Sequence, residues 1–268
     1  MNRRTFLLAG AAAPFAPALH AFAEAAIPIA DMHFHLFFVG PKPAHSQPLA
    51  RNMARGGATL AAWSLVGDMP WLKIAPGGFK QKGAPKGSEP VSWLDDEMRR
   101  IQAHVDEQGL KIARSAADVD AALAGTRHVV LSVEGATFTN DGADKVAHAH
   151  ALGIRQIQLV HYISNPLADF QTERPAHGGM TEQGRAVIAA CEKAGVLVDL
   201  AHCSDQAARD ALAVAKKPLI FSHGSVAPAG RTPNHTMSVF KARQLRLETA
   251  RMIADKGGVV GLWALGAD

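Results

Sequence analysis

Cysteine is scarce in this chain. Its two cysteines, Cys191 and Cys203, form no Cys-x-x-Cys pair. A structural zinc knuckle needs such pairs, so that class of site is excluded. A single disulfide and two free thiols both remain open, and we expect two buried free thiols, because free cysteine is among the most buried residue types.

Charge is limited, and long apolar runs are missing beyond the N-terminus. Charged residues make up 19% and hydrophobic residues 48% of the 268 residues, which is the composition of a globular protein. The formal net charge is +4, but lysine and arginine are scattered, so we expect no nucleic-acid partner.

No later apolar run reaches about 18 residues, so we expect no integral membrane segment after the N-terminal segment is removed.

The N-terminus has the pattern of an export signal. Arg3 and Arg4 precede an alanine-rich apolar run that ends in Ala21-Phe22-Ala23, a small-x-small cleavage pattern. A membrane anchor is disfavoured because prolines interrupt the run, which is shorter than the roughly 20 apolar residues needed to span a bilayer. We interpret residues 1–26 as a twin-arginine signal peptide and expect a periplasmic or secreted protein.

From residue 27 onward, short apolar runs rich in β-branched residues alternate with segments of helical periodicity, as in repeated β-α units. The predicted strands are Ile27 to His33, Thr59 to Val66, His128 to Val133, Arg155 to His161, Gly195 to His202, Pro218 to His223 and Gly258 to Leu265. The predicted helices are Trp93 to Gln108, Asp118 to Leu123, Asp144 to Ala151, Thr181 to Lys193, Asp205 to Val214 and Ala242 to Asp255. The segment from Pro70 to Ser92, rich in glycine, proline and lysine, is predicted to be a loop, either plain or a lid.

An open doubly wound sheet is the alternative, but no Gly-x-Gly-x-x-Gly pattern follows the first strand to support nucleotide binding. The number of predicted strands is one short of the eight of a TIM barrel. We therefore predict an α/β fold over residues 27–268, a TIM-like (β/α)8 barrel that lacks its last β/α unit in the given sequence.

Histidines and one glutamate lie at or just after the ends of predicted strands. These residues are His33, His35, Glu134, His161, His202 and His223. A lone histidine beside an apolar strand is usually a core or surface residue. In a barrel, however, the C-terminal ends of the strands converge on one face, so these side chains would meet in one cavity. Imidazoles and a carboxylate without a thiolate suit zinc or a similar divalent ion in a catalytic site.

A ligand assignment follows from the spacing. His33 and His35 share one face of a strand and are predicted to bind one ion, while His202 and His223 bind a second. Glu134 is the candidate bridge, and two ions about 3.5–4 Å apart would hold a hydroxide that attacks a carbonyl carbon. Other histidines lie away from the C-terminal ends of the predicted strands and are expected to face solvent: His45, His104, His128, His148, His150 and His177.

Several ordered blocks resemble the renal, or membrane, dipeptidase family of the amidohydrolase superfamily. They are Asp31-Met32-His33-Phe34-His35-Leu36, Val133-Glu134-Gly135, Leu152-Gly153-Ile154-Arg155, Gln158-Leu159-Val160-His161, Gly179-Met180-Thr181-Glu182-Gln183-Gly184, Val198-Asp199-Leu200-Ala201-His202-Cys203-Ser204 and Ser222-His223-Gly224-Ser225. The resemblance implies two zinc ions per chain on the ligands assigned above. It also implies a zinc-dependent metallopeptidase that hydrolyses the peptide bond of dipeptides by a hydroxide bridging the two ions.

The resemblance further implies roles around the metal ligands. His161 matches the histidine that polarises the scissile carbonyl, so Glu134 and His161 are the predicted catalytic residues. Arg231 is the nearest match to an arginine that binds the substrate carboxylate. Two departures stand out: the family usually has aspartate at the position of His35, and its acid/base aspartate follows an eighth strand that lies beyond Asp268.

The predicted partner is a small-molecule dipeptide, and a homodimer is left open. Cleavage of an N-acyl amino acid, a cyclic amide or a lactone is an alternative, because the same two-metal site serves these reactions. An inactive, truncated barrel is a third possibility.

Overall fold

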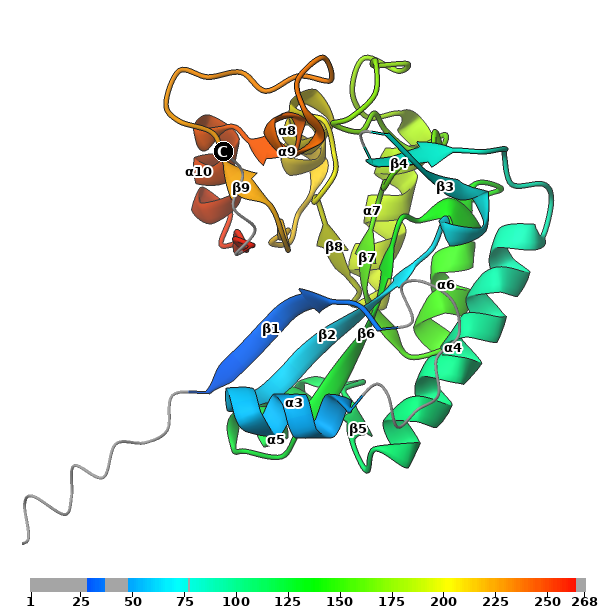
Figure 1. The fold of residues 1–268 in the computed structure, drawn as a ribbon, viewed down its shortest axis with the longest axis vertical. Helices are drawn as coiled ribbons and strands as arrows, with labels where there is room; N and C mark the ends of the chain where they lie inside the picture. The colour runs from blue at the N-terminus through cyan, green and yellow to red at the C-terminus, as the bar shows by residue number, and fades with distance from the viewer. Residues whose placement is uncertain (1–27, 37–47, 77, 264–268) are drawn as a thin grey trace, which may run out of the picture.

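A computed structural model describes residues 28–36, 48–76 and 78–263 (Figure 1). The interpreted signal peptide at residues 1–26 lies outside the described residues, as does His45. Export therefore stays a prediction.

A parallel sheet forms the centre of the fold. Its strands pair in the order β1-β2-β6-β7-β8, and β5 pairs with the start of β6. The strands are β1 Ile29–Phe34, β2 Ala58–Val66, β5 Lys111–Ile112, β6 His128–Glu134, β7 Ile154–Gln158 and β8 Leu197–Asp199. Because all of these pairings are parallel, the carboxyl ends of the strands lie at the same edge of the sheet.

Two further predicted strands continue this order as single bridges. Asp199 pairs in parallel with Ile220, and Phe221 pairs in parallel with Val260. Within the described residues, the segments at 218–223 and 258–263 are thus not regular strands, and residues 264–265 lie outside the described part. The sequential parallel order, with helices between the strands, confirms the predicted TIM-like α/β fold.

The helices between the strands mostly follow the predicted positions. They are α3 Leu49–Gly56, α4 Glu89–Glu107, α5 Ala116–Leu123, α6 Lys145–Ala151, α7 Glu182–Ala194, α8 Asp205–Val214, α9 Val239–Ala242 and α10 Leu247–Asp255. Helix α7 shows why. The Thr181 hydroxyl accepts a hydrogen bond from the Gly184 amide, and Gly195 ends the helix in the left-handed conformation (φ 73°). The side chains of Val187 and Cys191 are buried on its inner face.

Three segments differ from the prediction. The predicted helix from Ala242 to Asp255 is interrupted, because β10 (Gln244–Leu245) pairs with β9 (Ser225–Val226) between α9 and α10. Pairing with a distant segment outweighs the local helical periodicity there. The predicted loop from Pro70 to Ser92 contains a hairpin of β3 (Leu72–Ala75) and β4 (Gly78–Gln81), preceded by a 3-10 turn. Helix α3 was not predicted.

Burial corrects part of the histidine prediction and agrees with the cysteine prediction. His104 packs edge-on against Trp63, and His128 donates from Nδ1 to the carbonyl of Thr126; both are buried, so the expectation that they face solvent was wrong. Cys191 and Cys203 are free and buried, and burial raises the pKa of the Cys191 thiol to about 12. Both thiols are therefore protonated at neutral pH.

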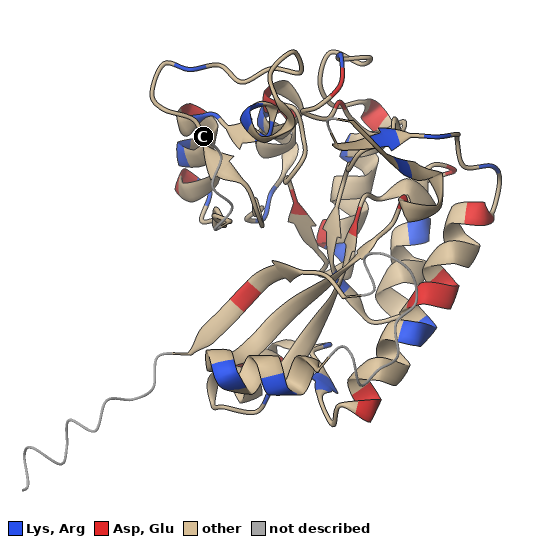
Figure 2. Ribbon diagram, in the orientation of Figure 1, with Lys and Arg blue, Asp and Glu red and all other residues tan. Residues whose placement is uncertain are grey.

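Charged residues of both signs are interspersed over the outer helices and loops (Figure 2). Among the described helices, none is long and apolar enough to cross a membrane.

Candidate metal centre

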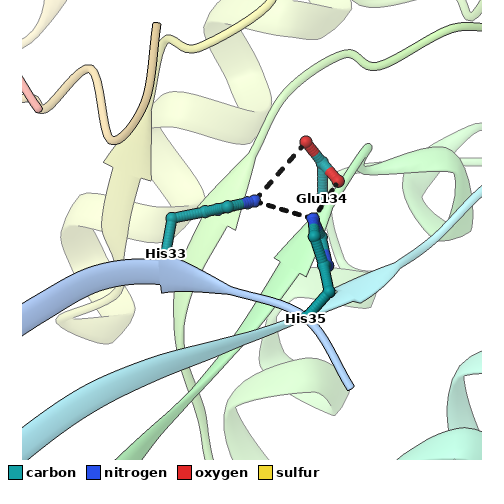
Figure 3. Close-up of side chains that lie close together, drawn as sticks. All are labelled: His33, His35 and Glu134. Carbon is teal, nitrogen blue, oxygen red and sulfur yellow. Dashed lines mark hydrogen bonds and ion pairs between the residues drawn. The ribbon is translucent and has the colours of Figure 1, made fainter. Parts of the chain in front are cut away.

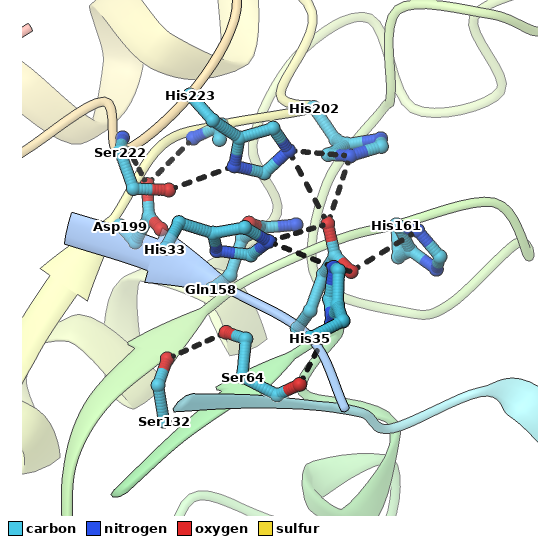
Figure 4. A network of polar contacts seen from close by, with 12 residues as sticks. His33, His35, Ser64, Ser132, Gln158, His161, Asp199, His202, Ser222 and His223 are labelled. Carbon is cyan, nitrogen blue, oxygen red and sulfur yellow. Dashed lines mark hydrogen bonds and ion pairs between the residues drawn. The ribbon is translucent and has the colours of Figure 1, made fainter. Parts of the chain in front are cut away.

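The carboxyl ends of the strands bring the predicted chemistry together. His33 and His35 come from the end of β1, Glu134 is the last residue of β6, and the remaining histidines follow β7, β8 and the bridged segment at Phe221 (Figure 4). Six predicted residues line one cavity of about 400 Å³: His33, His35, Glu134, His161, His202 and His223.

Glu134 lies at the centre of this group, and only 1% of the residue is exposed. Its Oε2 is 3.2 Å from His35 Nε2 and 3.4 Å from His161 Nε2. Its Oε1 is 3.1 Å from His202 Nε2 and 3.4 Å from His223 Nε2, with His33 Nε2 at 3.7 Å (Figures 3 and 4). Each carboxylate oxygen thus faces its own set of imidazole nitrogens.

Hydrogen bonds behind the rings fix which nitrogen faces the centre. His35 Nδ1 donates to the carbonyl of Ser64 at 2.8 Å, which leaves the Nε2 lone pair directed toward Glu134. His223 Nδ1 lies 2.9 Å from the Ser222 hydroxyl. Partners of this kind set the tautomer and the orientation of a metal-ligating imidazole.

The pKa shifts match the protonation states that ligands need. Burial alone would raise the pKa of Glu134, but His161, His35 and His33 outweigh it and hold that pKa well below its usual range. Burial lowers the pKa of His33 well below its usual value, and burial with Arg243 does the same for His202. These shifts favour the ionised carboxylate and the neutral imidazoles of His33 and His202, which are the forms that metal binding requires.

The donor set fits divalent metal ions. The ligand atoms of His33, His35 and Glu134 lie within 4.8 Å of one another, as do those of Glu134, His202 and His223. Imidazole nitrogens and a carboxylate, without thiolate, suit zinc, and three protein ligands leave coordination positions open to the cavity.

Local backbone geometry supports the centre. His202 has a positive φ of 67°, a conformation that few non-glycine residues adopt and that occurs at functional sites. Gly135, next to Glu134, has a φ of 90°, and a Cβ there would lie 3.1 Å from the Cβ of His161. Glycine therefore allows the end of β6 to pass close to His161.

Asp199 is a buried residue that was not predicted as part of the site. Its ligand atom lies within 4.8 Å of those of His33 and His223. Its Oδ1 accepts hydrogen bonds from the Ala201 and Ser222 amides, each at 3.0 Å, and burial raises its pKa. Because Ser222 precedes His223, this carboxylate ties the end of β8 to the segment that carries His223.

Other residues around the cavity were also missed. Asp68 accepts a hydrogen bond from His161 Nδ1 at 2.7 Å, and it follows the end of β2, so the strand-end rule applied to the other residues would have found it. Arg243 lines the cavity but falls inside the helix predicted from Ala242 to Asp255. Arg231 is exposed in a loop and does not line the cavity.

Sequence comparison identifies the family. The profile of the membrane dipeptidases, Peptidase family M19, matches residues 84–265. The chain belongs to this family. The membrane dipeptidase match contains Glu134, His161, His202, His223 and Arg243, whereas His33 and His35 precede it.

A curated relative resembles the chain in sequence, and solved structures resemble it in fold. Dipeptidase tcpJ of Claviceps purpurea is 31% identical over 148 residues, 53% of this chain and 33% of that protein. The chain thus spans about a third of the length of this relative. The crystal structure of a metallopeptidase from Rhodobacter sphaeroides, bound to a phosphinate mimic of L-Ala-D-Ala, aligns with a TM-score of 0.67 at 20% identity, over 88% of this chain and 73% of that chain. The probable dipeptidase PvdM from Pseudomonas aeruginosa aligns with a TM-score of 0.67 at 19% identity, over 97% and 63%.

Replacing the shared carboxylate should remove metal. We expect Glu134→Gln to lower the zinc content of the purified chain strongly, because the neutral amide no longer offsets the ions' charge at either set of imidazoles. Elemental analysis after dialysis against limiting zinc measures this. Glu182→Gln, on an exposed residue of α7, is the matched control and should keep the wild-type content. Equal zinc in wild type and Glu134→Gln would rule out Glu134 as a ligand.

Proposed function

We propose that this chain hydrolyses the peptide bond of dipeptides at a centre of two zinc ions. The shared carboxylate of Glu134 carries the proposal, because its Oε2 is 3.2 Å from His35 Nε2 and its Oε1 is 3.1 Å from His202 Nε2. A carboxylate between two ligand sets is typical of two-metal hydrolytic sites. Membership in the membrane dipeptidase family, and the dipeptide mimic bound to the Rhodobacter relative, support a dipeptide substrate.

Two zinc ions held by His33, His35, Glu134, His202 and His223 would supply a hydroxide nucleophile at neutral pH and would polarise the carbonyl group. Beside them, His161 contributes a hydrogen-bond donor. His161 Nδ1 donates to Asp68 Oδ1 at 2.7 Å, and Asp68 Oδ2 accepts from the Tyr162 amide at 3.1 Å, so His161 Nε2 faces the centre. From there it donates a hydrogen bond to the scissile carbonyl oxygen as negative charge develops.

The pKa of His161 suits this role. Burial lowers it, but the carboxylates of Asp68 and Glu134 outweigh burial and raise it above its usual value. The ring is therefore better able to hold a proton at Nε2 than an unpaired histidine would be.

Arg243 is the residue that we assign to the substrate carboxylate. It is 5% exposed, lines the cavity, and places Nη2 2.9 Å from His223 Nε2 and Nη1 3.4 Å from Tyr162 Oη. A planar guanidinium binds a carboxylate through paired hydrogen bonds. The exposed position of Arg231 outside the cavity makes Arg243 the better candidate for the role predicted for Arg231.

The reaction is tested by metal removal. We expect the purified chain to hold about two zinc ions and to hydrolyse Ala-Ala, to lose activity with a chelator, and to regain it with zinc. N-acetyl-alanine and a lactone serve as competing substrates, since the same centre chemistry could act on them. Zinc binding with turnover of these compounds and none of Ala-Ala would contradict dipeptide hydrolysis.

The arginine assignment makes a separate prediction. Arg243→Lys should raise the KM of Ala-Ala about tenfold or more, because an ammonium cannot reproduce the paired hydrogen bonds. Arg231→Lys is the matched control and should leave KM within about twofold. Zinc content measured in both variants shows whether the centre is intact. The opposite pattern, with only Arg231→Lys affected, would return the role to Arg231.

We also propose that residues 1–26 direct export by the twin-arginine route, on the basis of Arg3, Arg4 and the Ala21-Phe22-Ala23 pattern. Arg3→Lys together with Arg4→Lys should then retain the protein in the cytoplasm of a bacterial host. Cell fractionation measures this. Periplasmic protein from the double variant would argue against the route.

A further inference from the structure

The cavity has an aromatic wall beside the metal centre, where the Tyr162 ring centroid lies 4.9 Å from that of His202 and the Trp263 ring centroid 5.9 Å from that of His223. Apart from the candidate ligands and His161, its lining consists of Gly78, Phe79, Tyr162, Val239, Phe240, Arg243 and Trp263. Among the lining residues that the structure describes, Arg243 is the one charged residue in this second set. The cavity therefore offers, next to the candidate metal ligands, a cation in contact with aromatic rings.

These rings form two groups. On the hairpin side, Phe79 and Tyr162 have ring centroids 5.7 Å apart. On the α9 side, Phe240 and Trp263 have ring centroids 6.1 Å apart. The hairpin and α9 approach each other at Gly78, the first residue of β4. A Cβ atom added at Gly78 would lie 3.9 Å from Cγ2 of Val239, the first residue of α9. The wall is thus built from four segments that are distant in the sequence: the hairpin, Tyr162, α9 and Trp263.

Arg243 connects this wall to the proposed substrate carboxylate. Its Cζ lies 4.6 Å from the centroid of the Trp263 ring and 5.9 Å from that of Tyr162. A carboxylate bound by Arg243 places the Cα atom that carries it, and therefore the C-terminal side chain, beside these rings. Phe240 is 44% exposed, so a ligand side chain that covers it removes apolar surface from water.

We propose that this cavity selects dipeptides whose C-terminal residue has a bulky apolar side chain, aromatic or branched aliphatic, and that Phe240 determines the selectivity. The inference rests on the proposed dipeptidase function. A C-terminal glycine leaves the rings uncovered, and a C-terminal aspartate places a second anion among them. Apolar contact of this size changes kcat/KM by about tenfold or more.

The test uses the zinc-loaded full chain and the series Ala-Gly, Ala-Leu, Ala-Phe and Ala-Asp. Each dipeptide with a chiral C-terminal residue is prepared with that residue in both configurations, because the inference concerns size and polarity. We expect kcat/KM for Ala-Phe and Ala-Leu to exceed that for Ala-Gly and Ala-Asp about tenfold or more, in at least one configuration. In Phe240→Ala the ratio of Ala-Phe to Ala-Gly should fall several-fold. Leu123→Ala is the control, because Leu123 is also a large, exposed hydrophobic residue but lies on α5. It should keep the wild-type ratio of Ala-Phe to Ala-Gly.

Binding measured by calorimetry separates the two proposals. Hydrolysis without preference for Ala-Phe, or with a preference that Phe240→Ala leaves unchanged, overturns the selectivity and spares the dipeptidase function. A second outcome is that Ala-Phe binds more tightly than Ala-Gly, that Phe240→Ala abolishes this difference, and that neither dipeptide is hydrolysed. This outcome supports the apolar subsite and overturns the dipeptidase function. If the chain shows no turnover of dipeptides and no preferential binding of Ala-Phe, both proposals are overturned.

Discussion

A buried carboxylate is the constraint on which the site depends. Glu134 is removed from water and can stay ionised only if positive charge or hydrogen-bond donors surround it. The fold meets this requirement by ending parallel strands around it, so that imidazoles from β1 and from the residues after β7 and β8 face its two oxygens. Gly135 lets the backbone approach His161, and hydrogen bonds behind the rings hold the nitrogens in place.

The centre could be predicted from the sequence because the rule that places it is topological. Parallel strands carry their carboxyl ends to one edge, so a histidine or glutamate at each strand end predicts a shared cavity whatever the loop lengths. His33, Glu134 and His202 are placed together by that rule alone, and the structure brings them into one cavity. Asp68 obeys the same rule, since it lies two residues after β2.

Features that depend on non-local pairing could not be predicted in the same way. The sequence around Arg243 has helical periodicity, and only the ladder between β9 and β10 shows that the helix breaks there. The hairpin of β3 and β4 lies in a segment whose glycines and prolines predict a loop. Both segments carry residues of the cavity, namely Arg243 and Phe79. Local patterns therefore located the chemistry but missed the parts that contact a substrate beyond the reacting bond.

The ligands of the centre come from both ends of the described chain, since His33 lies on β1 and His223 follows a segment that pairs with Asp199 and Val260. No short peptide contains the site, so forming it requires the sheet to be assembled. Metal affinity and conformational stability are then one linked equilibrium: bound ions shift the population toward the assembled sheet. A substitution in the buried core, far from any ligand, would consequently weaken the apparent affinity for the ions by the factor by which it lowers the fraction of assembled chains.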